Sequence, residues 1–312
     1  MPKIKAVAIG GGTGLPVALK CLKQYADEIT AIVSVADDGG SSGRLRRDIG
    51  ILPPGDIRNC LVALAKDEQM ARLFKYRFTQ GDGIAGHSLG NLIIAALADL
   101  HGSFEDSIRV ASKILSVQGR VLPSTTGNVT LRATTYDDEP VIGQVKIAQT
   151  TKPLKRVYLE PEDVEAYPEA VEAILEADQV LIGPGSVFTS ILPNLIVPGI
   201  GRALVESKAI KVYICNVLTQ PGETDLFTAC DHVAALVDHG SADWLDVVVV
   251  NTHPLPDKEL LSYAENRRYP VSITTENIKA LGVNLVLADV LDENNPACHD
   301  ANKLASILRE LV

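Results

Sequence analysis

A short segment, SVADDGGSSGRLRRD at positions 34–48, gathers carboxylates, glycines, small hydroxyl residues and arginines in sorted order. Carboxylates suit a hard cation such as Mg²⁺, which proteins hold together with a substrate's phosphates. Glycine and serine backbone amides can form a nest for anionic oxygens, and guanidinium groups can clamp a phosphate with paired hydrogen bonds. A diphosphate ligand, with or without a metal, accounts for all three groups, and a surface loop of mutually neutralising charges is the alternative. The candidate residues are Asp37, Asp38, Ser41, Ser42 and Arg44.

Two glycine-rich loops follow apolar runs and precede helical patterns. Such loops bring backbone N–H groups close to a phosphate at a helix N-terminus. The first is not a regular G-x-G-x-x-G motif, because Leu15 takes the place of the third glycine. A tight strand-to-helix turn is the alternative for the first loop, and an ordinary serine N-cap is the alternative for the second. The candidate ligand-binding residues are Gly11, Gly12, Thr13 and Gly14 in the first loop and Gly183, Gly185, Ser186 and Thr189 in the second.

A third loop, CNVLTQPGETD at positions 215–225, offers mixed hydrogen-bond donors and acceptors. Asn216, Thr219, Gln220, Glu223 and Thr224 have the side chains that read a sugar or the edge of a base. A plain polar loop that caps the following helix is an equal alternative. We expect the side chains of Asn216, Thr219 and Gln220 to lie within hydrogen-bonding reach of a bound nucleoside or sugar.

Two helix starts carry further polar residues. His87 and Asn91 are four residues apart, so they share one face at the polar end of an apolar helix, and a structural histidine is as reasonable there as a ligand-binding one. The stretch PPGDIRN predicts a helix that begins with Asp56 as its N-cap.

Several classes of protein are disfavoured. The chain has no H-E-x-x-H, no G-x-S-x-G and no Walker lysine, so a metalloprotease, a serine hydrolase and a P-loop NTPase do not fit. A net charge of −10 argues against nucleic acid or an anionic membrane as partner. Five cysteines without CxxC spacing indicate reduced thiols, and no apolar run approaches the ~20 residues of a membrane span. These features predict a soluble cytoplasmic protein.

Short apolar runs alternate with helical patterns along most of the chain. The runs are residues 4–10, 29–36, 178–183, 211–218, 245–251 and 283–290. Near-continuous Val/Ile runs separated by helices indicate a parallel sheet covered on both faces, which is a Rossmann-like three-layer α/β sandwich. Residues 57–115 predict at least three helices. Residues 120–149, with the turn YDDEP, predict an antiparallel hairpin added to the main sheet of a single domain spanning 1–312.

The stretches GGGTGL, VADDGGSSGRLR, PPGDIRN, GHSLGN, IGPGSVFTSILPNLIVPGI and VYICNVLTQPGETD resemble the bacterial gluconeogenesis factor family. That family lies within the superfamily of 2-phospho-L-lactate transferases, which are enzymes of deazaflavin cofactor synthesis. The resemblance implies a cytoplasmic protein that binds UDP-sugars, notably UDP-N-acetylglucosamine, and that influences cell shape and peptidoglycan synthesis on gluconeogenic carbon sources without an established reaction. It also implies a homodimer and no required cofactor. One position departs from the family pattern, because Cys298 stands where an arginine is usual.

Three hypotheses follow. The first is a sugar-nucleotide-binding regulator. The second is a transferase that moves a phospholactyl group from a nucleoside diphosphate, with Mg²⁺ held by Asp37 or Asp38. The third is a dinucleotide-binding dehydrogenase, which the irregular glycine loop and the lack of an acidic residue at the end of the second apolar run disfavour. The residues alone do not separate the first two, and the resemblance favours the regulator. The strand-end loops at residues 10–14, 37–47, 183–189 and 216–224 are expected to line one cleft.

Overall fold

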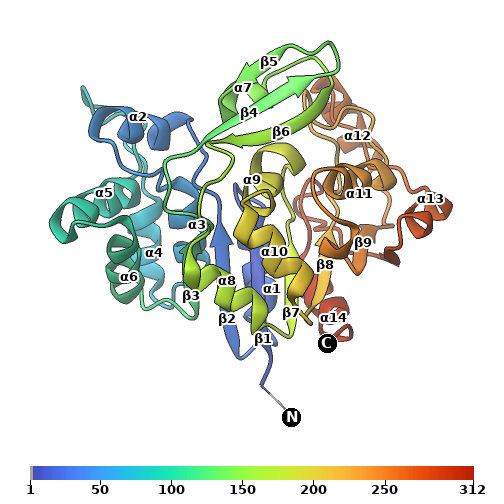
Figure 1. Cartoon of the computed structure of the whole chain (residues 1–312), viewed down its shortest axis with the longest axis horizontal. Helices are drawn as coiled ribbons and strands as arrows, with labels where there is room; N and C mark the ends of the chain where they lie inside the picture. The colour runs from blue at the N-terminus through green and yellow to red at the C-terminus, as the bar shows by residue number, and fades with distance from the viewer. Residues whose placement is uncertain (1–2) are drawn as a thin grey trace.

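A computed structural model describes residues 3–312 and places seven parallel strands in one central sheet. The strand order is β10-β9-β8-β7-β1-β2-β3 (Figure 1). The chain therefore moves outward from β1 in one direction and outward from β7 in the other, so the order reverses between these two neighbours. The strands are β1 (Lys5–Gly10), β2 (Glu28–Val33), β3 (Arg120–Pro123), β7 (Gln179–Ile182), β8 (Ile210–Ile214), β9 (Val247–Asn251) and β10 (Asn284–Ala288).

Helices cover both faces of the sheet, which confirms the predicted three-layer sandwich. Right-handed crossovers that leave a central point in opposite directions place their helices on opposite faces. The helices α1 (Leu15–Leu22), α3 (Gly55–Leu64) and α14 (Ala301–Arg309) pack together behind the sheet in the view of Figure 1. The elements η1 (Val187–Ile191), α9 (Leu192–Leu195), α10 (Pro198–Glu206) and α8 (Pro168–Leu175) lie in front of it.

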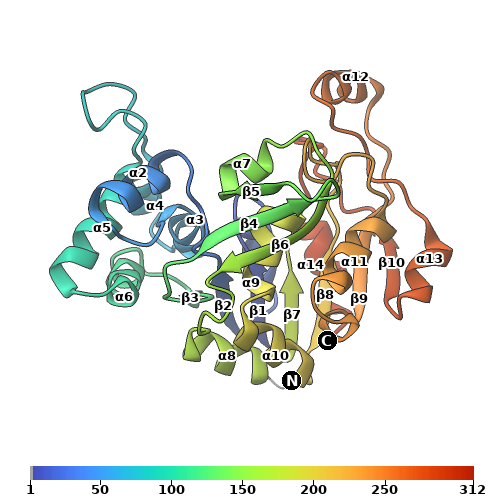
Figure 2. The ribbon, with the colours of Figure 1, turned by 45° about the horizontal axis from the view of Figure 1, so that its top comes forward.

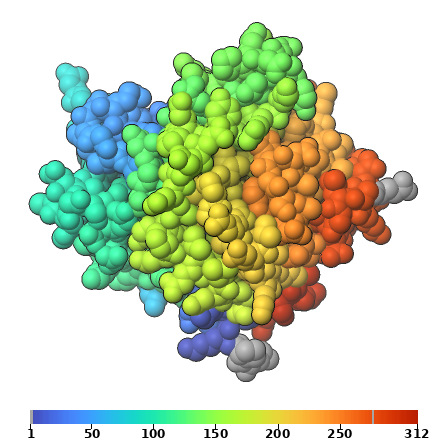
Figure 3. Space-filling model, in the orientation of Figure 1, coloured from blue at the N-terminus to red at the C-terminus, as the bar shows by residue number. Residues whose placement is uncertain are grey.

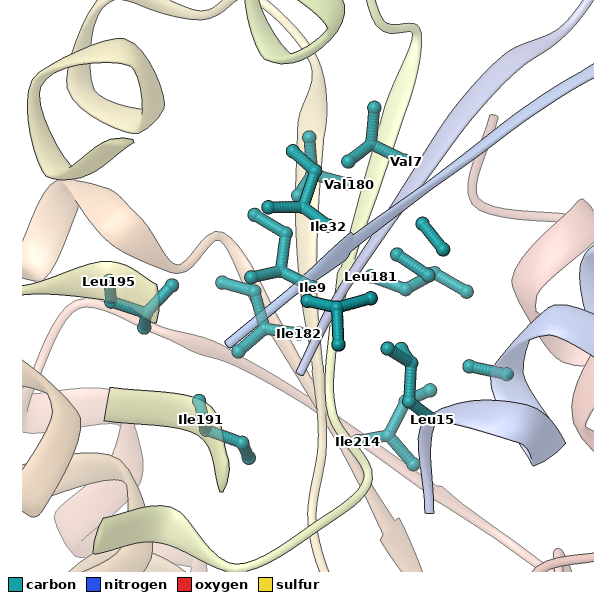
Figure 4. Close-up of a cluster of buried hydrophobic side chains, with 14 of the residues drawn as sticks. Val7, Ile9, Leu15, Ile32, Val180, Leu181, Ile182, Ile191, Leu195 and Ile214 are labelled. Carbon is teal, nitrogen blue, oxygen red and sulfur yellow. The ribbon is translucent and has the colours of Figure 1, made fainter. Parts of the chain in front are cut away.

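The core lies around β1, β2 and β7. Ile9 pairs with Ile32 on one side and with Ile182 on the other, and all three side chains are fully buried (Figure 4). Leu15 at the start of α1 and Ile191 at the end of η1 approach this cluster from the two faces of the sheet. Because both faces are buried, the strands contain continuous apolar residues instead of alternating ones.

Most of the remaining helices lie beside the two edges of the sheet, near β3 and near β10 (Figure 1). Five helices connect β2 to β3, so the prediction of at least three helices there is confirmed. Besides α3, they are α2 (Gly40–Ile49), α4 (Glu68–Lys75), α5 (Leu89–His101) and α6 (Phe104–Ile114). The other end carries α11 (Ala229–Asp238), η2 (Ala242–Trp244), α12 (Asp257–Glu265) and α13 (Thr275–Ala280).

The predicted hairpin is present, but it is not part of the main sheet. Strands β4 (Thr130–Thr135) and β5 (Pro140–Ile142) pair antiparallel, and β6 (Leu154–Glu160) pairs with the other side of β4. Residues 120–123 instead form β3 and pair with β2 in parallel. The alternation of β6, LKRVYLE, marks a half-buried strand that was not predicted from the sequence.

The small sheet and the short helix α7 (Gln144–Ala148) lie across the carboxyl ends of the main strands (Figures 1 and 2). In the space-filling view they form the green surface between the N-terminal helices and the C-terminal part of the chain (Figure 3). The carboxyl edge of the main sheet is therefore roofed by a separate layer.

Among residues 3–312, no single helix is both long enough and apolar enough to cross a membrane. One bent pair, Val187–Leu195 and Pro198–Glu206, passes by length and composition only when its two parts are taken together, with an angle of 76° between them.

Candidate functional site

A cavity of about 390 Å³ opens at the carboxyl edge of the sheet, where the loops after β1 and β7 meet. This is the point at which the strand order reverses, and open α/β sheets bind ligands there. Nine of the residues that line it were predicted from the sequence as ligand-binding, namely Gly11, Gly12, Thr13, Gly14, Gly185, Ser186, Thr189, Asn216 and Gln220. Glu223, which was named among the polar residues of the third loop, also lines the cavity. The lining residues Gln144, Ala148, Arg268 and His299 were not predicted, and Cys298 was singled out only as a departure from a family pattern.

The first glycine loop is bonded to a carboxylate from α3. The N–H of Gly12 donates to Asp56 Oδ2 over 2.7 Å, and a Cβ built on Gly11 would lie 2.7 Å from the same oxygen. The prediction that Asp56 caps its own helix is wrong, because α3 begins at Gly55 and the residue before it, Pro54, provides no side-chain cap. Burial raises the pKa of Asp56 to about 6, although the hydrogen bond from Gly12 opposes the shift.

The two glycine loops touch each other. A Cβ on Gly14 would lie 2.2 Å from the carbonyl oxygen of Pro184, so only glycine permits this approach. Asn216 ties the third loop to the second, because its Oδ1 accepts from the N–H of Gly185 over 3.1 Å and its Nδ2 donates to the Gly185 carbonyl over 2.9 Å. Gly183 does not line the cavity, and it packs beneath the loop against Ile191.

A buried carboxylate from the third loop bonds to the second loop. Glu223 accepts hydrogen bonds from the hydroxyl of Ser186 and, over 2.9 Å, from that of Thr189. Burial raises the pKa of Glu223, and the hydrogen bonds from these two hydroxyls lower it in part. Ser186 Oγ also accepts from the Thr189 N–H, so Ser186 is both an N-cap and a wall of the cavity.

The two polar neighbours in the third loop have different environments. Thr219 is buried away from the cavity, and it pairs with Tyr269 through its own N–H (2.8 Å) and through its Oγ1, which accepts from the Tyr269 N–H (3.0 Å). Gln220 lines the cavity, and its Oε1 is buried without a hydrogen-bond partner among residues 3–312. Gln220 is therefore part of the cavity wall, whereas Thr219 is not.

The paired aspartates bond to two different elements. Asp37 Oδ1 accepts from the Gly39 N–H over 2.9 Å, and burial raises its pKa. Asp38 Oδ1 accepts from the Val145 N–H over 2.9 Å and so caps α7, whose own N-cap residue Gly143 has no side chain. Neither aspartate is among the residues that line the cavity, and the described part of the chain holds no cluster of three His, Cys, Asp or Glu residues suited to a metal.

Ser41, Ser42 and Arg44 lie in the first turns of α2, not in a loop. Ser42 Oγ accepts from the Gly55 N–H over 3.1 Å, and Arg44 donates to the Ala85 carbonyl over 2.8 Å. These three side chains are therefore engaged with the protein itself, and none of them lines the cavity.

Ser41, His87 and Asn91 form a buried network with Arg58. Ser41 Oγ lies 2.9 Å from His87 Nδ1 and accepts from Asn91 Nδ2 over 3.0 Å, while Arg58 donates to Asn91 Oδ1 over 3.1 Å. Burial is the main cause that lowers the pKa of His87. This arrangement fits the structural alternative for His87 and Asn91, and neither residue lines the cavity.

The segment before α14 also lines the cavity. His299 donates from Nε2 to the Cys215 carbonyl over 3.0 Å, and burial lowers its pKa to about 4, so the ring is neutral at physiological pH. Cys298 lines the cavity beside it and is half-buried, and its Sγ accepts from Asn295 Nδ2 over 3.1 Å.

Comparison with known proteins gives one family over most of the chain. The family model described as "2-phospho-L-lactate transferase CofD" matches residues 6–291. A protein from Bacillus subtilis (strain 168) named "Gluconeogenesis factor" is 46% identical over 312 residues, covering 99% of this chain and 98% of the relative. Another of that name, from Halalkalibacterium halodurans, is 46% identical over 313 residues and covers 99% and 97%. A crystal structure of a UPF0052 family protein from Bacillus halodurans is 44% identical, with a TM-score of 0.96 over 99% of each chain.

Proposed function

The chain belongs to the 2-phospho-L-lactate transferase CofD family and is similar over its length to gluconeogenesis factors, and from this premise we propose that it is a cytoplasmic sugar-nucleotide-binding regulator. Its ligand is a UDP-sugar of the UDP-N-acetylglucosamine type. The bound state controls cell shape and peptidoglycan synthesis during growth on gluconeogenic carbon sources.

The observation that carries the proposal is the cavity at the point where the strand order reverses. Its volume of about 390 Å³ falls within the range of about 300–1,000 Å³ that ligand cavities occupy. Its walls combine the amide of Gln220, which has a buried acceptor oxygen without a partner in residues 3–312, with the carboxylate of Glu223 and the guanidinium of Arg268. A sugar nucleotide offers hydroxyl and imide donors together with a diphosphate, and so matches both kinds of group.

The test is titration calorimetry of UDP-N-acetylglucosamine, preceded by a thermal-shift panel that adds GDP, NAD and a deazaflavin. A ligand that binds only the folded protein stabilises it by RT ln(1 + [L]/Kd), so the true ligand class should raise the melting temperature most. We expect UDP-N-acetylglucosamine to do so and to bind equally well in EDTA and in Mg²⁺. A larger shift with NAD would refute the proposal in favour of a dinucleotide binder.

The second candidate is a Mg²⁺-dependent transferase that moves a phospholactyl group from a nucleoside diphosphate, and membership of the 2-phospho-L-lactate transferase CofD family favours it. The aspartates that would hold the metal do not fit this role well. Asp37 and Asp38 each bond to a backbone amide, they face different elements, and neither lines the cavity. The contacts of these two carboxylates therefore favour the regulator over the transferase.

The same calorimetry separates the candidates. Asp37→Asn and Asp38→Asn each keep an acceptor oxygen, so a regulator should retain its affinity in both variants, with and without Mg²⁺. Three results would establish the transferase instead. They are binding that strictly requires Mg²⁺, loss of Mg²⁺-dependent binding in either variant, and a new product after long incubation with a nucleoside diphosphate substrate.

A further inference from the structure

We propose that Arg268 binds the ligand's diphosphate, so that the phosphates lie against the segment after α12 and not against the glycine loops. This inference deepens the proposed function and rests on it. It concerns a residue in a chain segment, residues 266–270, that carries no glycine-rich or phosphate-binding pattern.

The first support is the distribution of charge around the cavity. Arg268 is the only lysine or arginine among the described residues that line it, and the other ionisable walls are Glu223, Cys298 and the neutral ring of His299. Glu223 forms no ion pair with Arg268 in residues 3–312, since it accepts from Ser186 and Thr189. The cavity is therefore polarised, with a carboxylate on one wall and a guanidinium on another.

The second support is that three backbone donors of the glycine loops are already bonded to the protein itself. The Gly12 N–H donates to Asp56, the Gly185 N–H donates to Asn216, and the Thr189 N–H donates to Ser186. A phosphate at the first loop would also face the Asp56 carboxylate. Like charges in a partly desolvated site repel strongly, so the diphosphate gains most at the guanidinium.

The third support is that the backbone holds Arg268 in place while its side chain keeps no ion pair. The neighbouring Tyr269 pairs with Thr219 through two hydrogen bonds, and the Arg268 N–H donates to the Tyr263 carbonyl over 3.0 Å. The guanidinium carbon lies 5.5 Å from the centre of the Tyr263 ring. Among the side chains that the structure describes (residues 3–275 and 277–312), no carboxylate forms a salt bridge with Arg268, whereas the adjacent Arg267 pairs with Asp225 over 3.1 Å. Its planar donors are therefore free for paired hydrogen bonds to phosphate oxygens.

The test compares Arg268→Gln with Arg267→Gln, which removes the same charge one residue away. Calorimetry with UDP-N-acetylglucosamine should show a loss of about 10- to 100-fold for Arg268→Gln, the range of a hydrogen bond to a charged group, and little change for Arg267→Gln. Arg268→Lys should recover part of the affinity, because an ammonium keeps the charge without the planar fork. The affinity for UDP-N-acetylglucosamine should fall less steeply with added salt in Arg268→Gln than in the wild type.

Uridine, which lacks the phosphates, provides the second probe. Its competition with UDP-N-acetylglucosamine should give the same uridine affinity for the wild type and for Arg268→Gln. Equal losses for both ligands, or equal losses in Arg267→Gln and Arg268→Gln, would overturn the assignment of the diphosphate to Arg268. If the wild type binds neither nucleotide nor nucleoside, the proposed function fails first, and the inference fails with it. Normal binding in a folded Arg268→Gln variant refutes the inference alone.

Discussion

Asp56 shows why a single residue can be misread from its neighbours in sequence. An aspartate at a helix start usually accepts from its own helix, and that rule uses only residues a few positions apart. In this fold the carboxylate instead reaches Gly12, which lies 44 positions earlier in the chain. That contact exists only because α3 packs against α1, so no local pattern contains it.

The raised pKa of Asp56 gives a testable dependence on pH. Because the folded protein holds this proton more tightly than the unfolded chain, the contribution to stability is fully present below about pH 4 and is lost as the pH rises through about 6. Asp56→Asn keeps an acceptor for Gly12 and removes the titration. Relative to the wild type, the variant should gain roughly 2 kcal/mol in its free energy of unfolding between pH 4 and pH 7.

Urea denaturation at several pH values measures this difference. Asp99→Asn is the matched control, since Asp99 is an exposed residue of α5. The control removes one exposed carboxylate of α5, and we expect it not to reproduce the gain of Asp56→Asn. A constant difference between Asp56→Asn and the wild type at all pH values would contradict the burial of its charge as the cause.

Thr219 and Gln220 are adjacent in the chain, yet their variants should separate stability from binding. Gln220→Ala removes a cavity acceptor, so affinity for UDP-N-acetylglucosamine should fall about 5-fold while the melting temperature stays nearly constant. Thr219→Val leaves the Tyr269 N–H without its acceptor, which should cost about 1–3 kcal/mol of stability. Calorimetry and thermal denaturation of both variants test this prediction. A loss of affinity in Thr219→Val with unchanged stability would instead indicate that Thr219 contacts the ligand.

At the scale of elements, the contact between the loops after β1 and β7 depends on Gly14. The residue has ordinary helical dihedrals, with φ of −79°, so alanine would cost nothing locally. Its Cβ would however lie 2.2 Å from the Pro184 carbonyl oxygen. Gly14→Ala should therefore lower the free energy of unfolding by roughly 3 kcal/mol, since backbone atoms cannot move aside easily.

Gly102→Ala is the control for Gly14→Ala. Gly102 ends α5 with φ of +79°, and a Cβ there would meet nothing within 4 Å. Its substitution should cost only about 1 kcal/mol from the left-handed conformation. Chemical denaturation measures the free energy of unfolding of both variants. A smaller loss of stability in Gly14→Ala than in Gly102→Ala would show that the two loops can separate freely.

The elements themselves were largely predictable, because their causes are local. The runs VVVV of β9 and IKAVAIG around β1 indicate buried parallel strands from composition alone. The position of β3 was not predictable, since four residues of edge strand carry too little pattern to distinguish the main sheet from a hairpin. The same holds for Arg268 in the site, because only the pairing of Tyr269 with Thr219 brings it to the cavity.

At the scale of the whole molecule, two distant layers meet at the cavity. Gln144 and Ala148 of α7 line it from the roof, and Arg268 lines it from the segment after α12. Binding of UDP-N-acetylglucosamine should therefore slow amide hydrogen exchange in both segments at once and leave α6 unchanged. Exchange measured by mass spectrometry with and without the ligand tests this. Protection limited to the first glycine loop would place the ligand elsewhere along the edge of the sheet.

Asp56 and Glu223, the two buried carboxylates that bond to the glycine loops, also affect which molecules the cavity excludes. Cells hold millimolar concentrations of inorganic phosphate and other small anions, and empty amide nests at the end of a sheet would collect them. Asp56 already accepts from the Gly12 N–H, and Glu223 accepts from the hydroxyls of Ser186 and Thr189. A small anion in the cavity would therefore gain the Arg268 guanidinium but would be repelled by these carboxylates. A ligand that joins a donor-rich part to an anionic part satisfies both walls together. Selectivity against common metabolites would then come from the protein's own negative charges.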